Sequence, residues 1–501
     1  MLTKSSSHSL TEQLAGRFAE RIRTRLLAPG TRLPSVRQCA KTHNVSPSTV
    51  VAAYDQLLAQ GLVEARKNRG FFVREFNTNP AVVSEKWRHD AINNVANTGD
   101  GAMPEMVSPP GWAPPAVAWS GLACAPHAVA YPSNATALIR GMFHRISNKP
   151  QPGMGVFPPE WLESTFLPAA VRKVTSAKML NALSLQYGEP LGDAVLRRAL
   201  SQRLANLNIQ APPEHIMTTL GATHALDIVS RTLLQPGDCV MVEEPGWAVE
   251  FARLGALGMR ILPVPRGPAG PDLEVMSRYC EVHAPKLYVS VSVLHNPTGY
   301  SLSPGSAHRV LQLANQHNFY IVEDDTYSHI APEHATRLCA LDGLQRTVYV
   351  SGFAKILAPN WRVGYLAAPP DLVERLLDTK LLSTLTTPAL LERAMALCIE
   401  QGQLRRHAER IRTRLDAARA RTVKLALAHG CTFAAEPAGL FGWVDTGVDT
   451  DALAQRMLDE GYLLAPGALF HAGRKPSTLM RINFATTQDA VFWGVFERLR
   501  G

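Results

Sequence analysis

One lysine, Lys355, lies among small residues just after a predicted strand, where its amine could take part in a reaction. It follows the apolar run 348–350 in the stretch "YVSGFAKILAPNWRVGY", and Arg362 lies seven positions later. The chemistry would be attack of the amine on a carbonyl group, a common use of lysine as a nucleophile. A lone lysine after a strand is more often a solvated surface charge, so the other polar clusters of the chain must decide.

Four further clusters follow short apolar runs. Gly221-Ala222-Thr223 opens a helix, where free N–H groups and the helix dipole favour an anion. "EPGW" supplies the indole of Trp247, and "HNPTG" supplies the amide of Asn296. "VEDDTY" supplies Asp324 close to Tyr327, and a buried carboxylate needs a partner. No histidine or further acid lies at ligand spacing, so no metal site is expected. Each cluster alone also has an ordinary explanation as a turn, core or surface residue.

The elements that must position these clusters alternate between strand and helix from about residue 155 onward. Short, strongly apolar runs interleaved with helical stretches indicate an α/β fold with a mainly parallel sheet. Functional sites in such sheets gather at the carboxyl ends of the strands, where all five clusters lie. Together they offer a phosphate seat, a flat aromatic, an amide, a carboxylate and a lysine. These are the groups that a protein needs to bind a phosphorylated pyridine aldehyde.

The order and spacing resemble fold-type I pyridoxal-phosphate enzymes of the aminotransferase class, over residues 155–501. The resemblance implies that Lys355 forms the Schiff base with the cofactor and that Asp324 pairs with the pyridine nitrogen. It further implies the following contacts: Asn296 and Tyr327 to the ring hydroxyl, Trp247 stacked on the ring, and Ala222, Thr223 and Arg362 around the phosphate.

Two more motifs extend this resemblance. "LQYGEPLGDAVLRRAL" implies that Tyr187 reaches the phosphate of a neighbouring subunit, and "LMRINFA" implies that Arg481 binds the α-carboxylate of a substrate or effector. The sequence departs from the family pattern before the lysine, where Gly352 and Ala354 replace two hydroxyl residues. The nearest hydroxyl, Ser351, is assigned to the cofactor site. Two neutral hydrogen bonds of about 0.5–1.5 kcal/mol each are absent, so lower cofactor affinity is expected.

The first 76 residues form a basic head. They contain twelve Lys or Arg and five Asp or Glu, a net charge of +7, whereas the other 425 residues carry +2 of the total +9. Apolar residues spaced by four predict a helix over 10–27, stopped by Pro29-Gly30. Ser35 with Gln38 predicts a capped short helix over 36–42, broken by Asn44, and Ser46-Pro47 starts a longer one. This order is typical of a helix-turn-helix.

Two strand-like runs, 62–65 and 71–74, enclose a basic hairpin tip that has the character of a wing. The third helix is expected to enter the major groove of double-stranded DNA, with its N-terminal residues facing bases or phosphates and the cations holding the backbone. The residues assigned to DNA are Ser46, Ser48, Thr49, Arg37, Arg66, Lys67 and Arg69. A helical protein-interaction module with a basic face is the alternative. The stretch 10–75 resembles the winged-helix domain of GntR-family regulators through "PGTRLPSVRQCAK", "NVSPSTVVAAYDQL" and "GLVEARKNRGFFV".

Composition sets the remaining limits. A length of 501 residues, 46% hydrophobic and 19% charged, indicates more than one well-buried domain. Seven scattered cysteines without CxxC pairs fit reduced thiols, and no stretch of about 18 apolar residues occurs, so a cytoplasmic protein without membrane contact is expected. The expected domains are a winged helix-turn-helix at 8–76, a proline-rich linker at 77–150 with a short helix at 135–146, and the cofactor domain at 151–501.

The combination resembles a MocR-type regulator. It implies a homodimeric transcription factor that holds pyridoxal phosphate and senses an amino compound, which displaces Lys355 as an external aldimine. The first alternative is a working aminotransferase with an accessory DNA-binding domain. The second is a DNA-binding repressor that has lost its cofactor.

Overall fold

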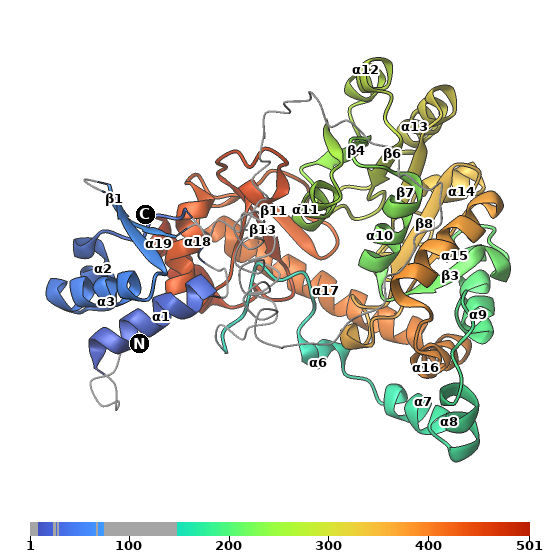
Figure 1. The fold of residues 1–501 in the computed structure, drawn as a ribbon, viewed down its shortest axis with the longest axis horizontal. Helices are drawn as coiled ribbons and strands as arrows, with labels where there is room; N and C mark the ends of the chain where they lie inside the picture. Colours follow the sequence, from blue (N-terminus) through green and yellow to red (C-terminus); the bar gives the residue numbers. More distant parts are fainter. Residues whose placement is uncertain (1–8, 24–26, 28–29, 67–68, 75–147) are drawn as a thin grey trace, which may run out of the picture. The chain divides into compact units, whose positions relative to one another are not determined.

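The computed structural model describes residues 9–23, 27, 30–66, 69–74 and 148–501 (Figure 1). The chain divides into two compact units, residues 1–133 and 134–501. Nearly all of the linker predicted for 77–150, and the helix predicted for 135–146, lie outside the described residues. The domain boundaries given above therefore stay a prediction.

The N-terminal unit is a helix-turn-helix followed by a two-stranded antiparallel hairpin. Its elements are α1 (Leu10–Arg23), α2 (Val36–His43), α3 (Pro47–Ala59), β1 (Val63–Arg66) and β2 (Gly70–Val73). The predicted caps are confirmed: the Ser35 hydroxyl accepts from Gln38 N, Asn44 ends α2 in the left-handed conformation, and Ser46 caps α3. The helix predicted for 10–27 is confirmed from Leu10 to Arg23 and is wrong at Leu27, and residues 24–26 lie outside the described residues. Leu27 N instead donates to Arg21 O, which is not a helical hydrogen bond.

A small aromatic core holds this unit together. Phe18 of α1 and Tyr54 of α3 meet edge to face, and Phe71 of β2 also packs edge to face against Tyr54. The Tyr54 hydroxyl donates to Pro34 O over 2.9 Å, which satisfies the only polar atom of this buried side chain. The core therefore fixes α3 against the turn that carries α2.

The second unit is built on a seven-stranded sheet with the order β3-β9-β8-β7-β6-β4-β5 (Figure 1). All pairs are parallel except those of β9 with β3 and with β8, so β9 alone is reversed. The mainly parallel sheet is thus confirmed. Its strands are β3 (Ile216–Thr219), β4 (Cys239–Glu244), β5 (Arg260–Pro265), β6 (Leu287–Ser290), β7 (Tyr320–Asp324), β8 (Thr347–Gly352) and β9 (Gly364–Ala367).

Helices cover both faces of this sheet. Alternate strand residues enter separate cores: Val240 and Val242 pack with α10, α11 and α15, whereas Cys239 and Met241 pack with α12 and α13. The helices that precede, connect and follow the strands of this sheet are α6 (Pro159–Leu162), α7 (Phe166–Val174), α8 (Ala177–Ser184), α9 (Ala194–Ala205), α10 (Ala222–Leu233), α11 (Ala248–Ala256), α12 (Leu273–His283), α13 (Pro304–His317), α14 (Leu338–Asp342), α15 (Pro370–Thr384) and α16 (Ala389–Glu400).

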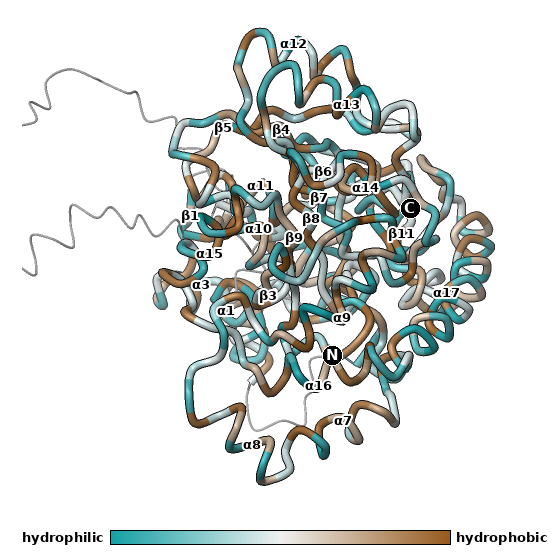
Figure 2. Tube along the Cα trace, turned by 90° about the vertical axis from the view of Figure 1, so that its right-hand side faces the viewer, coloured by the Kyte–Doolittle hydropathy of each residue, from teal (hydrophilic) through white to brown (hydrophobic). Residues whose placement is uncertain are grey.

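A second, antiparallel sheet follows, with the order β10-β11-β13-β12. The long helix α17 (Gln403–Ala428) leads into it, and Figure 2 shows hydrophilic and hydrophobic residues alternating along that helix. The remaining elements are β10 (Thr432–Phe433), β11 (Phe441–Asp445), α18 (Thr450–Asp459), β12 (Ala465–Pro466), β13 (Leu479–Asn483) and α19 (Ala490–Arg500), with short 3-10 turns at Pro213–His215, Pro359–Trp361 and Gly467–Phe470.

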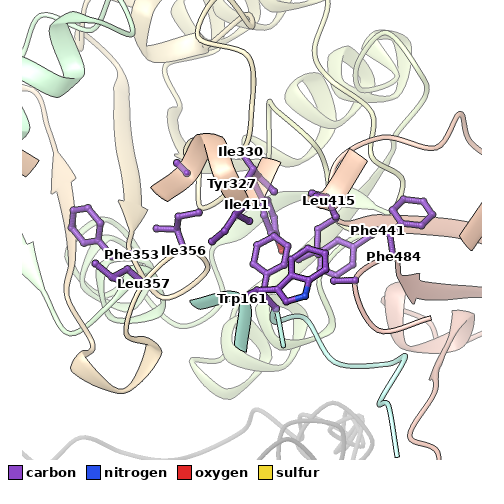
Figure 3. Close-up of a cluster of buried hydrophobic side chains, with 14 of the residues drawn as sticks. Trp161, Tyr327, Ile330, Phe353, Ile356, Leu357, Ile411, Leu415, Phe441 and Phe484 are labelled. Carbon is purple, nitrogen blue, oxygen red and sulfur yellow. The ribbon is translucent and has the colours of Figure 1, made fainter. Parts of the chain in front are cut away.

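One large apolar cluster joins the two sheets of this unit. Figure 3 shows Tyr327, Phe353 and Ile356, which follow large-sheet strands, in one cluster with Phe441 and Phe484 of the small-sheet region. This cluster holds the small sheet against the large one, beside the separate cores on the two faces of the large sheet. No helix in the described part of the chain is long and apolar enough to cross a lipid bilayer.

Candidate functional site

Lys355 lies in the turn that follows β8, and its amine points into the protein. Its Nζ donates to Gly155 O over 2.7 Å, although the two residues are 200 positions apart in the sequence. Burial, together with the positive charge of Arg481, lowers the pKa of Lys355 to about 8. A much larger fraction of this amine is therefore neutral, and nucleophilic, than of a surface lysine at the same pH.

Asp324 is the last residue of β7, and its carboxylate accepts hydrogen bonds from the backbone N–H and the hydroxyl of Thr326. Burial raises the pKa of Asp324 to about 6, and the negative charge of Glu250 adds to this rise. Tyr327 lies beside it, with its ring edge to face against Phe441 at 5.7 Å. Burial raises the pKa of Tyr327 well above its ordinary value, so the phenol stays a hydrogen-bond donor.

Arg481 on β13, a residue of the small sheet, lies close to Lys355 and Asn296. One of its terminal nitrogens donates to the Asn296 side-chain oxygen at 2.9 Å, and the other donates to Gly153 O at 2.6 Å. The guanidinium also lies over the Phe441 ring, 4.3 Å from its centroid. Its Nε is buried without a partner among the described residues, and burial lowers the pKa of Arg481 to about 10.

The N-terminus of α10, which the sequence predicts to bind an anion, follows β3 directly. Gly221 precedes Ala222 with a positive φ of 83° and provides no side-chain cap, which leaves the first N–H groups of the helix open. Arg362 donates to Leu220 O at 3.1 Å, beside this turn. A Cβ at Gly364 would lie 2.5 Å from Gly221 Cα, so β9 approaches the turn more closely than any other residue type allows.

The structure does not bring every predicted cofactor residue to this group. Trp247 caps α11 just beyond β4 and is half-buried, in keeping with a ring at the strand end. The Ser351 hydroxyl, by contrast, is fully buried and donates to Asp325 O at 2.9 Å. No hydrogen bond links it to Lys355 in the described structure, and its contact with a cofactor stays a prediction.

Tyr187 is 84% exposed, and no hydrogen bond or ring contact links its side chain to the site among the described residues. The segment after it is firmly anchored: buried Lys380 donates to Pro190 O at 2.6 Å, and Arg393 forms an ion pair with Asp193 at 2.6 Å. The exposed tyrosine thus precedes an anchored segment, an arrangement that would allow it to contact a second subunit.

Three residues of the site were missed by the sequence reasoning. The backbone of Gly153 and Gly155 accepts from the two site cations, and a Cβ at Gly155 would lie 3.6 Å from Lys355 Nζ. Phe441 provides the ring between Tyr327 and Arg481. The two glycines in "QPGMGVF" were a usable signal, because closely spaced glycines often mark a close backbone approach.

The predicted DNA-contacting residues of the N-terminal unit lie at its surface. Arg37, Ser46, Ser48, Arg66 and Arg69 are exposed and Thr49 is half-buried, whereas Lys67 lies outside the described residues. The Arg66 guanidinium forms an ion pair with Glu64 at 2.7 Å and lies over the Phe72 ring. Arg37 is thus a free surface cation on α2, whereas Arg66 is held on the hairpin.

These features define the class of the protein. A winged helix-turn-helix, with its cations at the surface, is joined in one chain to an α/β domain with an amine, an acid and an anion seat at the strand ends. This is the organisation of a DNA-binding regulator with a small-molecule domain derived from an aminotransferase.

Comparisons with known proteins agree. Residues 10–73 match the family described as bacterial regulatory proteins, gntR family, and residues 162–499 match aminotransferase class I and II. The chain belongs to the aminotransferase class I and II family and, with its GntR helix-turn-helix, is a MocR-type regulator.

Relatives and a solved structure are similar along most of the chain. The HTH-type transcriptional regulator YisV of Bacillus subtilis is 24% identical and covers 92% of this chain and 90% of its own length. The probable rhizopine catabolism regulatory protein MocR of Rhizobium meliloti is 28% identical over 78% of this chain and 73% of its own. The α-aminoadipate aminotransferase LysN of Thermus thermophilus has the same fold, with a TM-score of 0.65 and 24% identity over 72% of this chain and 93% of its own.

The family and these neighbours indicate pyridoxal phosphate as the cofactor, and the residues present fit it. When bound, this cofactor supplies an aldehyde for an amine and a ring that withdraws electrons. Lys355 provides an amine inside the site, the α10 N-terminus and Arg362 offer positions for an anion, and Asp324 is a half-buried acid that forms no ion pair among the described residues. A protonated ring nitrogen would pair with Asp324 and keep its carboxylate ionised. The unpartnered Arg481 Nε leaves a donor for a carboxylate.

Proposed function

We propose that this protein controls transcription in response to a small amino compound that binds at the cofactor site of its aminotransferase-like domain. The observation that carries the proposal is the arrangement around Arg481. This cation is buried beside Asn296 and near Lys355, has an unpartnered nitrogen, and lies on a different sheet from the lysine. A ligand with both an amine and a carboxylate would contact both sheets at once.

Binding of such a ligand could change the conformation of the protein and, through it, the affinity for DNA. A ligand shifts a conformational equilibrium only when it binds one state better than the other. Because Arg481 lies on the small sheet and Lys355 in the turn after a strand of the large one, a bridging ligand favours the state in which the two sheets are close. Closure of this kind is the event that we infer to alter DNA binding in the cytoplasm.

We further propose that the protein acts as a homodimer. Tyr187 is exposed just before an anchored segment, and Thr223 and Arg362 beside the α10 N-terminus are exposed, so a residue from another subunit could reach them. Two winged helices in one dimer would read two half-sites of an operator. Size-exclusion chromatography with light scattering tests this directly, and a monomer at all concentrations would contradict it.

An absorption spectrum of the purified, cofactor-loaded protein, titrated with a panel of amino acids and amines, tests the sensing proposal. The expected result is a spectral change with one or a few compounds, accompanied by a change in operator affinity at the same concentrations. Lys355→Ala should abolish the visible band, whereas the exposed-lysine control Lys424→Ala should keep it. A spectral change without any change in DNA binding would refute the proposal.

A working aminotransferase is the second candidate, favoured by the lowered pKa of Lys355 and by its position close to Arg481. Sustained production of a keto acid from an amino donor would support it. Protein that remains colourless after cofactor is added would instead favour a repressor that has lost its cofactor.

A further inference from the structure

The exposed face of α3 has an unusual composition for a helix that reads DNA. From Pro47 to Asp55 the helix contains no lysine, arginine, asparagine or glutamine. Its buried stripe is Val50, Ala53, Tyr54 and Leu57. The opposite face presents Ser48, Val51, Ala52 and Asp55 to solvent.

This composition limits what α3 can recognise in a major groove. Arginine or lysine pairs with guanine, and asparagine or glutamine pairs with adenine, through two hydrogen bonds each. The first nine residues of α3 offer none of these side chains. The cations that could pair with guanine lie on other elements, such as Arg37 on α2 and Arg69 on the hairpin.

The hydroxyl groups at the start of α3 are already engaged with one another. The Ser46 oxygen accepts from Thr49 N at 3.1 Å and lies 2.8 Å from the Ser48 oxygen and 2.7 Å from the Thr49 oxygen. Ser46 is therefore occupied as the helix cap. Hydroxyls also bond to several bases, so they add little discrimination.

The apolar pair Val51 and Ala52 remains. Val51 is 43% exposed and is the only large hydrophobic side chain of the described N-terminal unit that is strongly exposed. It lies one turn after Ser48, on the face opposite the buried stripe. An exposed valine beside an exposed alanine makes a methyl-rich surface, and the only methyl group in the major groove is the C5-methyl of thymine.

We propose that Val51, supported by Ala52, determines sequence specificity by packing against the C5-methyl group of a thymine in each operator half-site. The hairpin and α2 supply backbone and guanine contacts, and α3 reads shape and methyl groups. The operator should therefore contain a thymine at a fixed position within each half-site.

The test uses the full-length protein and begins with selection of preferred duplexes from a random DNA library. Each thymine in the selected site is then replaced by 2′-deoxyuridine, which removes only the methyl group. At one position per half-site the replacement should weaken binding of the unchanged protein by about fourfold, the effect of one buried methyl group. The same replacement should have almost no effect on Val51→Ala.

A matched control is Val491→Ala, which trims an equally large exposed valine on α19; it should respond to deoxyuridine as the unchanged protein does. Val51 is exposed, so its truncation should leave the thermal unfolding midpoint unchanged. Three outcomes would overturn the proposal: no preferred sequence, no thymine whose methyl group matters, or an equal loss for the unchanged protein and Val51→Ala.

Discussion

Restoring a hydroxyl at residue 352 should tighten cofactor binding. A Cβ built on Gly352 would lie 3.5 Å from Ala222 N and 3.3 Å from both Gly364 Cα and Val363 O. The side chain that is absent would therefore point at the anion seat, in ordinary to slightly tight contact. One neutral hydrogen bond contributes about 0.5–1.5 kcal/mol, so Gly352→Ser should lower the cofactor dissociation constant about two- to tenfold.

Equilibrium dialysis against pyridoxal phosphate, read by absorbance, measures this effect. Gly352→Ala controls for the added Cβ alone and should bind no more tightly than the unchanged protein. Gly364→Ala should have the opposite effect on cofactor affinity, because its Cβ would lie 2.5 Å from Gly221 Cα and 2.8 Å from Ala222 N. It must displace backbone and should loosen the seat. Equal affinities for Gly352→Ser and Gly352→Ala would refute the reasoning.

Three further predictions concern other parts of the protein. Arg37→Ala should weaken DNA binding on all sequences and lower the salt slope by about one, measured by fluorescence anisotropy at several salt concentrations; an unchanged slope would contradict this contact. The rate of cofactor uptake should rise about tenfold per pH unit and level off above pH 8, because neutral Lys355 accumulates up to its pKa of about 8; a rise that continues to pH 10 would show an ordinary lysine. Lys380→Met should weaken cofactor binding in the unchanged background but not in Tyr187→Phe, if Lys380 acts by positioning Tyr187; equal losses in both backgrounds would show a purely structural role.

The residues that follow strands could be predicted because position and chemistry coincide there. Asp324 ends a strand, and Lys355 and Asn296 follow strands within three and six residues; the parallel sheet brings such ends together. The caps of α2 and α3 were equally readable, since Ser35 and Ser46 act within three residues. Local signals of this kind need no knowledge of the tertiary structure.

Contacts between distant segments could not be predicted in this way. Gly155 meets Lys355, and Phe441 meets Arg481, only because the small sheet packs on the large one. The side of β8 on which the Ser351 side chain lies could not be predicted either. Ser351 and Tyr349 lie on the same face of the strand, and both side chains donate hydrogen bonds to Asp325. Residue type alone does not tell which side of a strand a hydroxyl faces.

The two acids at the end of β7 have opposite surroundings. Asp324 faces the cofactor site, whereas Asp325 is fully buried with Arg337 at 2.6 Å and the Tyr349 hydroxyl at 3.0 Å. A shift of the chain by one position would exchange a ligand-facing acid for a structural one and leave Arg337 as an unpaired buried charge. Insertions or deletions between α13 and β7 should therefore be excluded during evolution, even though that connection lies far from any ligand.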